Sequence, residues 1–366
     1  MSMIENVVNK DNYIMGFVNK YSNDKKSVIL FGVGASVDLY IKILDKYQIP
    51  IECIVDNNSN LYNTSLEGII IKSPDTLAQY DEAYVIVSAP SHIKAITSQI
   101  LGINNKIEVI QFDPSLEMIQ GVSSTDRNKF IKDNIKEYVK LYDLLSDDRS
   151  KYTLEKVVEG AITNSIFCYN DIFNASQYFP DIIMDNLSEN EVFVDIGAFT
   201  GDSTEEFTKV TNNRFDKVIG FEPKKENIEL ALAGINDPRV SFYPYGVGEK
   251  SETLYLYGNE GTDDFAFITD EKEENATEIE IVSLDEFISE RISYIKMDIE
   301  GMEISALKGA EKLIKKYHPK LAISVYHKID DLVTIPKYIM SLNADYKLYL
   351  RHYWGSCGTD TILIAI

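Results

Sequence analysis

The sequence is short of cysteine, of cationic side chains and of long apolar runs. Its 366 residues include three cysteines, Cys53, Cys168 and Cys357, which are far apart and odd in number. This usage excludes a disulfide-stapled secreted scaffold and indicates reduced thiols in a cytoplasmic protein. The first residues carry charges from Glu5 onward and lack the apolar core of a signal peptide.

Cationic side chains are outnumbered, with 36 Lys and Arg against 58 Asp and Glu and a net charge of −22. Nucleic-acid binding needs clustered Lys and Arg against phosphates, so this composition excludes nucleic acid as a partner. The negative net charge equally disfavours binding to an anionic membrane surface. No segment approaches the roughly 20 apolar residues of a membrane-spanning helix, so no membrane span is expected.

Strand and helix patterns alternate in both halves of the chain, and the length allows two domains. We expect a Rossmann-like α/β domain over residues 1–115, a helical linker over 116–175 and a second α/β domain over 176–366. In the first domain a strand runs into Gly32 and Gly34, and the next strand ends at Asp56. Val37 stands where a dinucleotide fingerprint has its third glycine, which favours a structural module over a nucleotide or nucleotide-sugar site.

The second domain begins with Glu191-Val-Phe-Val-Asp-Ile-Gly-Ala-Phe-Thr-Gly-Asp-Ser-Thr204. This pattern predicts a buried strand, a glycine turn, and a helix that starts at Asp202 or Ser203. Asp195 replaces the first glycine of a dinucleotide turn, and a carboxylate there repels phosphate. The turn to Gly201 is also one residue wider, which suits a neutral or zwitterionic ligand.

Glu222 ends the next predicted strand, 27 positions after Asp195. A second α/β strand delivers a carboxylate to a ribose diol at about this point. The two acids and the glycine turn between them predict a site for S-adenosylmethionine, with a purely structural turn as the alternative. The third strand leads to Tyr245 and Gly246, which offer a ring and backbone groups to an adenine.

Further acids converge on Ile292-Ser-Tyr-Ile-Lys-Met-Asp-Ile-Glu-Gly-Met-Glu303. A strand over Tyr294 to Met297 delivers Asp298 and Glu300 to the carboxyl edge of the sheet, where ligands bind in open α/β folds. The next strand, Lys320 to Lys328, ends in His327 beside Asp298. We expect His327 to be a general base with a pKa near neutrality, or a histidine that supports the site from behind.

Two schemes can activate an acceptor hydroxyl at this edge. In the first, His327 and Asp298 remove its proton. In the second, Asp298 and Glu300 hold a divalent ion that lowers the pKa of the hydroxyl. The first scheme is preferred because two carboxylates alone do not make a metal site, so no metal is expected.

Two antiparallel pairs are predicted outside the parallel strands. Leu254 to Tyr257 pairs with Glu278 to Ser283 and flanks an acid-rich loop in which Asp264 can contact a hydroxylated substrate. Asp345 to His352 and Thr361 to Ile366 form a hairpin that closes the sheet. Before the sheet, Tyr178 is either a lid over the cofactor or, as the better interpretation, a buried aromatic residue.

Residues from about 152 to 366 resemble the FkbM family of S-adenosylmethionine-dependent methyltransferases. The motifs that carry this resemblance occur in order along one domain: Val194-Asp-Ile-Gly-Ala198 with Gly201-Asp202, Gly220-Phe-Glu-Pro223, Ser283-Leu-Asp-Glu-Phe287, Tyr294-Ile-Lys-Met-Asp-Ile-Glu-Gly-Met-Glu303 and Leu307-Lys-Gly-Ala310. The resemblance implies an O-methyltransferase that acts on a hydroxyl of a sugar, glycolipid or polyketide.

The resemblance also implies that Asp195, Gly197 and Gly201 surround the methionine portion, that Glu222 binds the ribose, and that Asp298, Glu300 and His327 lie near the acceptor. Together with the patterns above, this gives the expected site. Catalysis falls to His327 and Asp298, and acceptor contacts to Glu300, Asp264 and Tyr178. The cofactor is assigned to Asp195, Gly197, Ala198, Gly201, Asp202, Glu222, Pro223, Tyr245, Gly246 and Asp298.

The first domain loosely resembles the N-terminal domain of bacterial sugar-modifying enzymes, in Phe31-Gly-Val-Gly-Ala35, Cys53-Ile-Val-Asp-Asn57 and Glu67-Gly-Ile-Ile-Ile-Lys-Ser-Pro74. A sugar or glycan hydroxyl is therefore the preferred acceptor, in capsule, O-antigen or glycolipid biosynthesis. The expected fold is two Rossmann-like doubly wound domains joined by a helical linker, the second a seven-stranded class I methyltransferase sheet.

Two other classes of function stay open. The chain can be a non-catalytic module that binds a nucleotide sugar, or a nicotinamide-dependent oxidoreductase that uses Gly32, Gly34 and Asp56. A homodimer is compatible with the sequence, which does not determine the oligomeric state.

Overall fold

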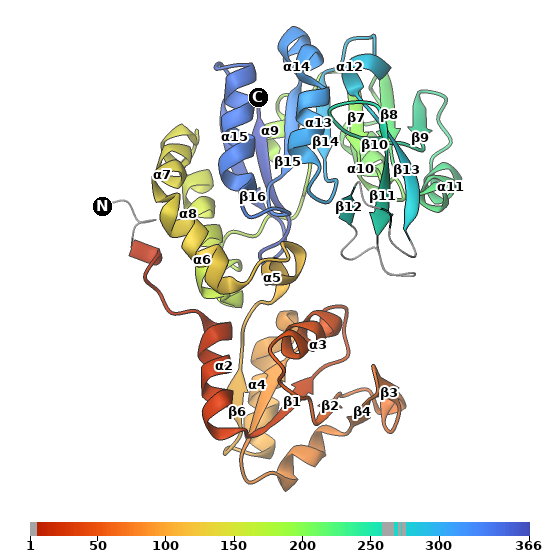
Figure 1. Ribbon diagram of the computed structural model, residues 1–366. Coiled ribbons are helices and arrows are strands. Elements are labelled where there is room, and N and C mark those ends of the chain that lie inside the picture. Colours follow the sequence, from red (N-terminus) through yellow and green to blue (C-terminus); the bar gives the residue numbers. More distant parts are fainter. Residues whose placement is uncertain (1–5, 258–266, 270–271, 273–275) are drawn as a thin grey trace. The chain divides into compact units, whose positions relative to one another are not determined.

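The computed structural model describes residues 6–257, 267–269, 272 and 276–366 (Figure 1). The chain divides into two compact units. The first unit comprises Met1–Ile135, Glu155–Ile172 and Trp354–Thr359. The second comprises Lys136–Leu154, Phe173–Tyr353 and Asp360–Ile366. The expectation of a mixed α/β architecture with two doubly wound sheets is confirmed.

The first unit is built on a six-stranded sheet with the order β3-β4-β2-β1-β5-β6. All neighbours are parallel except β3 and β4. The strands are β1 (Ser27–Phe31), β2 (Cys53–Val55), β3 (Ser65–Leu66), β4 (Ile69–Lys72), β5 (Ala83–Val87) and β6 (Glu108–Ile110).

Alternate side chains of β1 enter different cores. Val28 and Leu30 pack with helices α2 (Tyr13–Asp24) and α3 (Val37–Lys46), whereas Ile29 and Phe31 pack with α4 (Ile93–Ile103). Because both faces of the sheet are covered, its inner strands β2 and β5 are apolar throughout rather than alternating with polar residues.

The segment expected to be a linker is helical and contributes residues to both units. Its helices are α5 (Ser115–Ile119), α6 (Ser124–Asp133), α7 (Ile135–Leu144) and α8 (Asp148–Thr163). Within the first unit, the buried Arg127 of α6 donates to the carbonyl of Ala161 at 2.9 Å and to the side chain of Asn164 at 3.0 Å. These bonds satisfy part of a guanidinium that is costly to bury unpaired.

The second unit contains a seven-stranded sheet with the order β16-β17-β15-β14-β7-β8-β9. Five parallel strands are followed by the antiparallel β16 and β17, so the predicted closing hairpin is confirmed. The strands are β7 (Val192–Ile196), β8 (Lys217–Phe221), β9 (Val240–Tyr243), β14 (Tyr294–Met297), β15 (Lys320–Ser324), β16 (Leu348–His352) and β17 (Thr361–Ala365).

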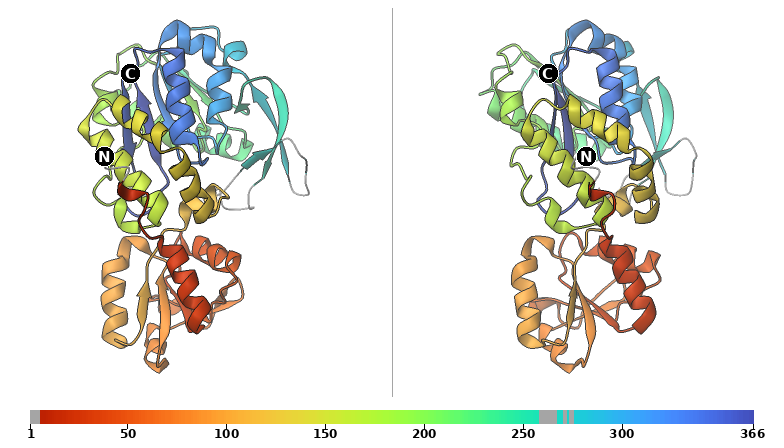
Figure 2. Two further views of the ribbon diagram at one scale, coloured as in Figure 1. Left: turned by 60° about the vertical axis from the view of Figure 1, so that its left-hand side comes forward. Right: turned by 90° about the vertical axis from the view of Figure 1, so that its left-hand side faces the viewer.

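Short connections keep helices against this sheet, which Figure 2 shows from two further sides. The helices are α9 (Asp181–Met184), α10 (Asp202–Val210), α11 (Lys225–Gly234), α12 (Leu284–Phe287), α13 (Glu303–Gly309), α14 (Glu311–Tyr317) and α15 (Asp331–Leu342). The predicted start of α10 at Asp202 is confirmed. β15 is shorter than expected because it ends at Ser324, so His327 lies in the turn that follows rather than at the strand end.

A smaller sheet projects from the second unit with the order β10-β13-β11-β12 (Figures 1 and 2). Its strands are β10 (Gly246–Val247), β11 (Glu252–Tyr257), β12 (Phe267–Thr269) and β13 (Thr277–Val282). β11 and β13 are antiparallel, as predicted from the sequence. Among the described residues, no helix is both long and apolar enough to cross a membrane.

An aromatic cluster fills one face of the seven-stranded sheet. The ring of Phe193 lies 4.6 Å from that of Phe207 and 4.9 Å from that of Tyr294, measured between centroids. Tyr178 and Phe179 join the same buried cluster. The interpretation of Tyr178 as a buried aromatic residue is therefore correct, and the cluster ties the segment before α9 to the central strands.

Replacing Phe193 by alanine is expected to remove about 3–5 kcal/mol from the free energy of unfolding, because it opens a cavity among these rings. The matched control is Leu232→Ala on α11, where the side chain is 53% exposed and the change should stay within about 0.5 kcal/mol. Urea unfolding followed by circular dichroism measures both. Equal transition midpoints for the two variants would contradict this description of the core.

Candidate active site

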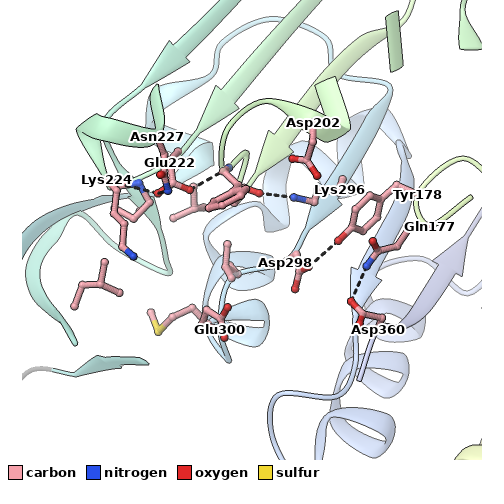
Figure 3. A pocket seen from close by; sticks show the side chains of 18 residues that line it. Gln177, Tyr178, Asp202, Glu222, Lys224, Asn227, Lys296, Asp298, Glu300 and Asp360 are labelled. Carbon is pink, nitrogen blue, oxygen red and sulfur yellow. Dashed lines mark hydrogen bonds between the residues drawn. The ribbon is translucent and has the colours of Figure 1, made fainter. Parts of the chain in front are cut away.

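A cavity of about 350 Å³ opens at the carboxyl edge of the seven-stranded sheet (Figure 3). Ligands of open α/β sheets bind at this edge, outside the strand ends. The cavity is lined by Gln177, Tyr178, Gly197, Phe199, Asp202, Glu222, Pro223, Lys224, Asn227, Gly246, Val247, Leu256, Lys296, Asp298, Ile299, Glu300, Met302 and Asp360. Five carboxylates and two lysines belong to this set, so its formal charge is −3.

Asp195 lies beneath the cavity rather than in its wall. Its carboxylate is fully buried and accepts hydrogen bonds from the hydroxyls of Ser203 at 2.6 Å and Thr204 at 2.7 Å. These hydroxyls belong to the first turn of α10, so Asp195 connects the end of β7 to the start of that helix. Its predicted place beside the glycine turn is observed, but its partners are protein groups.

Gly197 allows the chain to pass close to the neighbouring strand end. Its φ is +74°, and a Cβ atom there would lie 1.9 Å from the carbonyl oxygen of Asp298. Any other residue would push the turn and the end of β14 apart. The glycine is therefore required by backbone packing as well as by the cavity that it lines.

Lys296 is the main site residue that the sequence analysis did not assign. Its ammonium lies 3.2 Å from Asp195 Oδ1, donates to the carbonyl of Gly197 and sits 5.0 Å from the ring centre of Tyr178. Burial acts to lower the pKa of Lys296, but the carboxylates of Asp195 and Asp298 outweigh it and raise that pKa. A lysine inside an otherwise apolar strand was the available signal, since such a charge needs a buried partner.

Glu222 follows β8 and holds a fixed orientation in the cavity wall. One carboxylate oxygen accepts from the backbone N–H of Phe199 at 3.1 Å. The other accepts from the N–H of Lys224 at 3.0 Å and from the side-chain amide of Asn227 at 3.3 Å. Burial raises the pKa of Glu222 despite these donors. A carboxylate fixed in this way presents its remaining lone pairs to a ligand hydroxyl.

Asp298 occupies the other side of the cavity, next to Tyr178, Gln177 and Asp360 (Figure 3). Its carboxylate accepts from the hydroxyls of Tyr178 at 2.7 Å and Tyr326 at 3.2 Å. Burial acts to raise the pKa of Asp298, but the charges of His327 and Lys296 and the bond from Tyr178 lower it. Gln177 donates to Asp360 at 2.9 Å, which holds both polar side chains at the rim.

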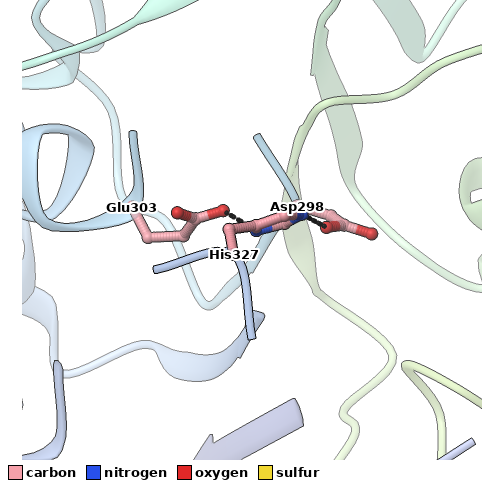
Figure 4. A group of neighbouring side chains, drawn as sticks. All are labelled: Asp298, Glu303 and His327. Carbon is pink, nitrogen blue, oxygen red and sulfur yellow. Dashed lines mark ion pairs between the residues drawn. The ribbon is translucent and has the colours of Figure 1, made fainter. Parts of the chain in front are cut away.

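His327 is buried among carboxylates (Figure 4). Its Nδ1 lies 2.9 Å from Glu303, and its Nε2 lies 3.4 Å from Asp298 and 3.6 Å from Glu300. The contact of 2.9 Å between Nδ1 and Oε1 of Glu303 is an ion pair whose geometry is not that of a hydrogen bond.

The near-neutral pKa expected for His327 is wrong. Burial acts to lower the pKa of the imidazole, but the neighbouring carboxylates, Glu303 first, raise it to about 10. At neutral pH the imidazole ring is therefore already protonated, so it cannot accept a proton from an alcohol. The sequence placed His327 beside Asp298 but did not show that three acids surround it.

The structure brings most of the predicted residues to one cavity. Those that line it are Tyr178, Gly197, Asp202, Glu222, Pro223, Gly246, Asp298 and Glu300. Those that do not line it are Asp195, Ala198, Gly201, Tyr245 and His327. Tyr245 instead lies 5.8 Å from the ring centre of Phe287, and Asp264 falls outside the described residues.

Apart from Lys296, the unassigned lining residues share one feature, which is that single-sequence patterns do not mark them. They are Gln177, Phe199, Lys224, Asn227, Val247, Leu256, Ile299, Met302 and Asp360. Gln177 and Asp360 come from segments far apart in the chain, and only the folded sheet brings them together.

The strand order of the second unit, with its antiparallel seventh strand and its edge cavity, defines a methyltransferase-type fold. The crystal structure of methyltransferase FkbM from Methylobacillus flagellatus KT matches with a TM-score of 0.74 and 23% sequence identity. The match covers 96% of this chain and 98% of that one. At this identity the likeness establishes the fold alone. An rRNA methylase from Streptococcus thermophilus matches at 16% identity over 50% of this chain and 90% of that one, with a TM-score of 0.33, which is too low to support an inference.

Residues 195–349 match the family described as the methyltransferase FkbM domain, which confirms the resemblance predicted from the motifs. Residues 23–110 match a second family, described as C2185-like, N-terminal. None of the curated proteins compared with the chain matches it.

Replacing Lys296 by methionine is expected to destabilise the protein by about 3–5 kcal/mol, because it leaves the buried carboxylate of Asp195 unpaired. The double variant Asp195→Asn with Lys296→Met should be more stable than Lys296→Met alone, since no uncompensated charge remains. Urea unfolding measures both.

The control is Lys308→Met, whose exposed partner Glu249 lies 3.2 Å away. It should change stability by less than about 1 kcal/mol. A Lys296→Met variant as stable as this control would show that the ion pair with Asp195 does not support the site.

Proposed function

We propose that this chain is an S-adenosylmethionine-dependent O-methyltransferase that acts on a hydroxyl of a sugar or glycan. The observation that carries the proposal is the fixed carboxylate of Glu222 at the end of β8, in the wall of a cavity at the sheet edge. That position suits the two hydroxyls of a ribose. The matched FkbM methyltransferase domain supports the same reaction class.

The chemistry of the other residues that line the cavity also suits S-adenosylmethionine. Beyond Glu222, its wall offers apolar groups to an adenine ring: Pro223, Val247, Leu256, Ile299 and Met302. The formal charge of −3 on the lining side chains suits a ligand that carries a sulfonium cation and disfavours a pyrophosphate. Gly197, Asp202 and Asp298 are the residues proposed to hold its methionine portion. When bound, S-adenosylmethionine supplies an electrophilic methyl group.

Asp298 is proposed to orient the acceptor hydroxyl and to take its proton. Tyr178 and Tyr326 fix the carboxylate by hydrogen bonds, and the lowered pKa keeps it ionised at neutral pH. An acceptor oxygen becomes strongly acidic as its bond to carbon forms, so a carboxylate suffices as proton acceptor. His327 is then a positioning residue, because its charge holds Asp298 in place.

A sugar or glycan acceptor is supported by the polar groups on the Asp298 side. Gln177, Glu300 and Asp360 offer amide and carboxylate groups to several hydroxyls at once. Capsule, O-antigen or glycolipid biosynthesis in the cytoplasm is the context we propose for such an acceptor. A ligand with several hydroxyl groups also suits the acidic wall of the cavity better than an apolar or an anionic ligand would.

Calorimetric titration with S-adenosylhomocysteine tests the cofactor assignment. We expect micromolar binding to the full chain, and a loss of affinity of about 10-fold or more in Glu222→Gln, because charged hydrogen bonds to the ribose are lost. Glu229→Gln on α11 is the control, since that side chain is exposed and does not line the cavity.

The same titration separates the other classes of function. Binding of NAD or of a nucleotide sugar without binding of S-adenosylhomocysteine at millimolar concentration would overturn the methyltransferase proposal. An equal loss of affinity in both variants would show that Glu222 has no special role.

Transfer of an isotopically labelled methyl group to a panel of sugars and glycans tests the acceptor class. Asp298→Asn should reduce the rate with an accepted sugar by about 100-fold or more, because the proton acceptor is removed. Asp202→Asn is a comparison within the same cavity that leaves the proton acceptor intact. Labelling of phenols or amines but of no sugar would contradict the proposed acceptor.

A further inference from the structure

Figure 4 shows three neighbouring side chains whose atoms could coordinate a metal ion, those of Asp298, Glu303 and His327. Asp298 follows β14, Glu303 begins α13, and His327 follows β15. One donor atom of each lies within 4.8 Å of the other two. Three separate segments of the chain therefore bring two carboxylates and an imidazole to one point.

Two of these side chains are buried with donor atoms that have no hydrogen-bond partner. Glu303 is 0% exposed and His327 is 5% exposed. Oε2 of Glu303 and Nδ1 of His327 both lack a partner in hydrogen-bond geometry. Buried polar atoms of folded proteins are almost always satisfied, so the unpaired Oε2 of Glu303, beside an imidazole whose Nδ1 is held only by an ion pair with Oε1, calls for a missing ligand.

The charge of the cluster favours a cation as that ligand. Asp298, Glu300 and Glu303 all lie within 3.6 Å of the imidazole. The nearest other buried cation, Lys296, is already engaged with Asp195. The protonated imidazole offsets only one of these three negative charges, so a net charge of −2 is left for a divalent cation to neutralise.

We propose that Asp298, Glu303 and His327 bind a divalent metal ion. Imidazole and carboxylate donors together suit Mn²⁺ or Zn²⁺ better than Mg²⁺, which keeps its water ligands. Donor atoms around such an ion lie roughly 3–4 Å apart, so a shift of one carboxylate closes the observed cluster. The ion replaces the ring proton, because a metal bonds to a neutral imidazole, and its own charge then takes over the role of holding Asp298 in place.

Asp298 also lines the cavity, so the ion lies at the acceptor side rather than the Glu222 side. There it can polarise a bound hydroxyl and ease the loss of its proton. Glu300, at 3.6 Å from His327 Nε2, is a further carboxylate beside the cluster. Its φ of +55° is unusual for a residue other than glycine.

The test is titration of the full chain with Mn²⁺ after treatment with a chelator, with free Mn²⁺ followed by electron paramagnetic resonance. We expect one Mn²⁺ site per chain. Its affinity for Mn²⁺ should fall about 10-fold or more in Glu303→Gln, because loss of a metal ligand costs at least as much affinity as loss of a residue that supports the ligand. Glu229→Gln is the matched control and should bind as the natural chain does. Circular dichroism checks that each variant is folded.

A second measurement needs no variant of the site. The chain has only four histidines, His92, His318, His327 and His352, so their imidazole signals are separable by proton magnetic resonance. Substoichiometric Mn²⁺ should broaden the signal of His327 before the other three. The assignment follows from His92→Gln, His318→Gln and His352→Gln, which lie outside the cluster.

Absence of Mn²⁺ and Zn²⁺ binding at millimolar ion would overturn the proposal. Binding that is equal in Glu303→Gln and Glu229→Gln, with no selective broadening of His327, would also overturn it. The outcome is independent of the proposed cofactor, because all of these measurements are made without S-adenosylhomocysteine.

Discussion

The ion pair between Lys296 and Asp195 is the interaction on which the rest of the second unit depends. It joins the two central strands, β14 and β7, at the edge where the cavity opens. Asp195 also holds the first turn of α10, while Lys296 holds the carbonyl of Gly197. Because both charges are buried, removal of either leaves the other without compensation. The position of the glycine turn therefore depends on this ion pair as well as on the conformational freedom of glycine.

This turn divides the cavity into two chemical halves. Phe199, within the turn, donates its N–H to Glu222 and so fixes the carboxylate on one half. On the other half, Asp298 lies against the same turn, where a side chain at Gly197 would meet its carbonyl. Glu222 and Asp298, the acids proposed to bind the ribose and the acceptor hydroxyl, are therefore held at a set separation by one short segment. That arrangement suits a reaction in which a cofactor and an acceptor must be aligned.

The fold was largely predictable because apolar runs, glycine turns and helical periodicity recur along the chain. The seven-stranded sheet and both antiparallel pairs follow from that pattern. Within the site, Glu222 and Asp298 were found because strand ends in parallel sheets meet at one edge. Gln177 and Asp360 could not be found, since their contact joins segments 183 residues apart. The charge state of His327 was missed for the same reason, because Glu303, Asp298 and Glu300 converge on it only in the folded chain.

The most direct test of the account is a crystal structure of the chain with S-adenosylhomocysteine. The account predicts that the ribose hydroxyls lie within hydrogen-bond distance of Glu222 and that the sulfur faces Asp298. Density for the ligand in the first unit, or in the second unit away from Glu222, would contradict it.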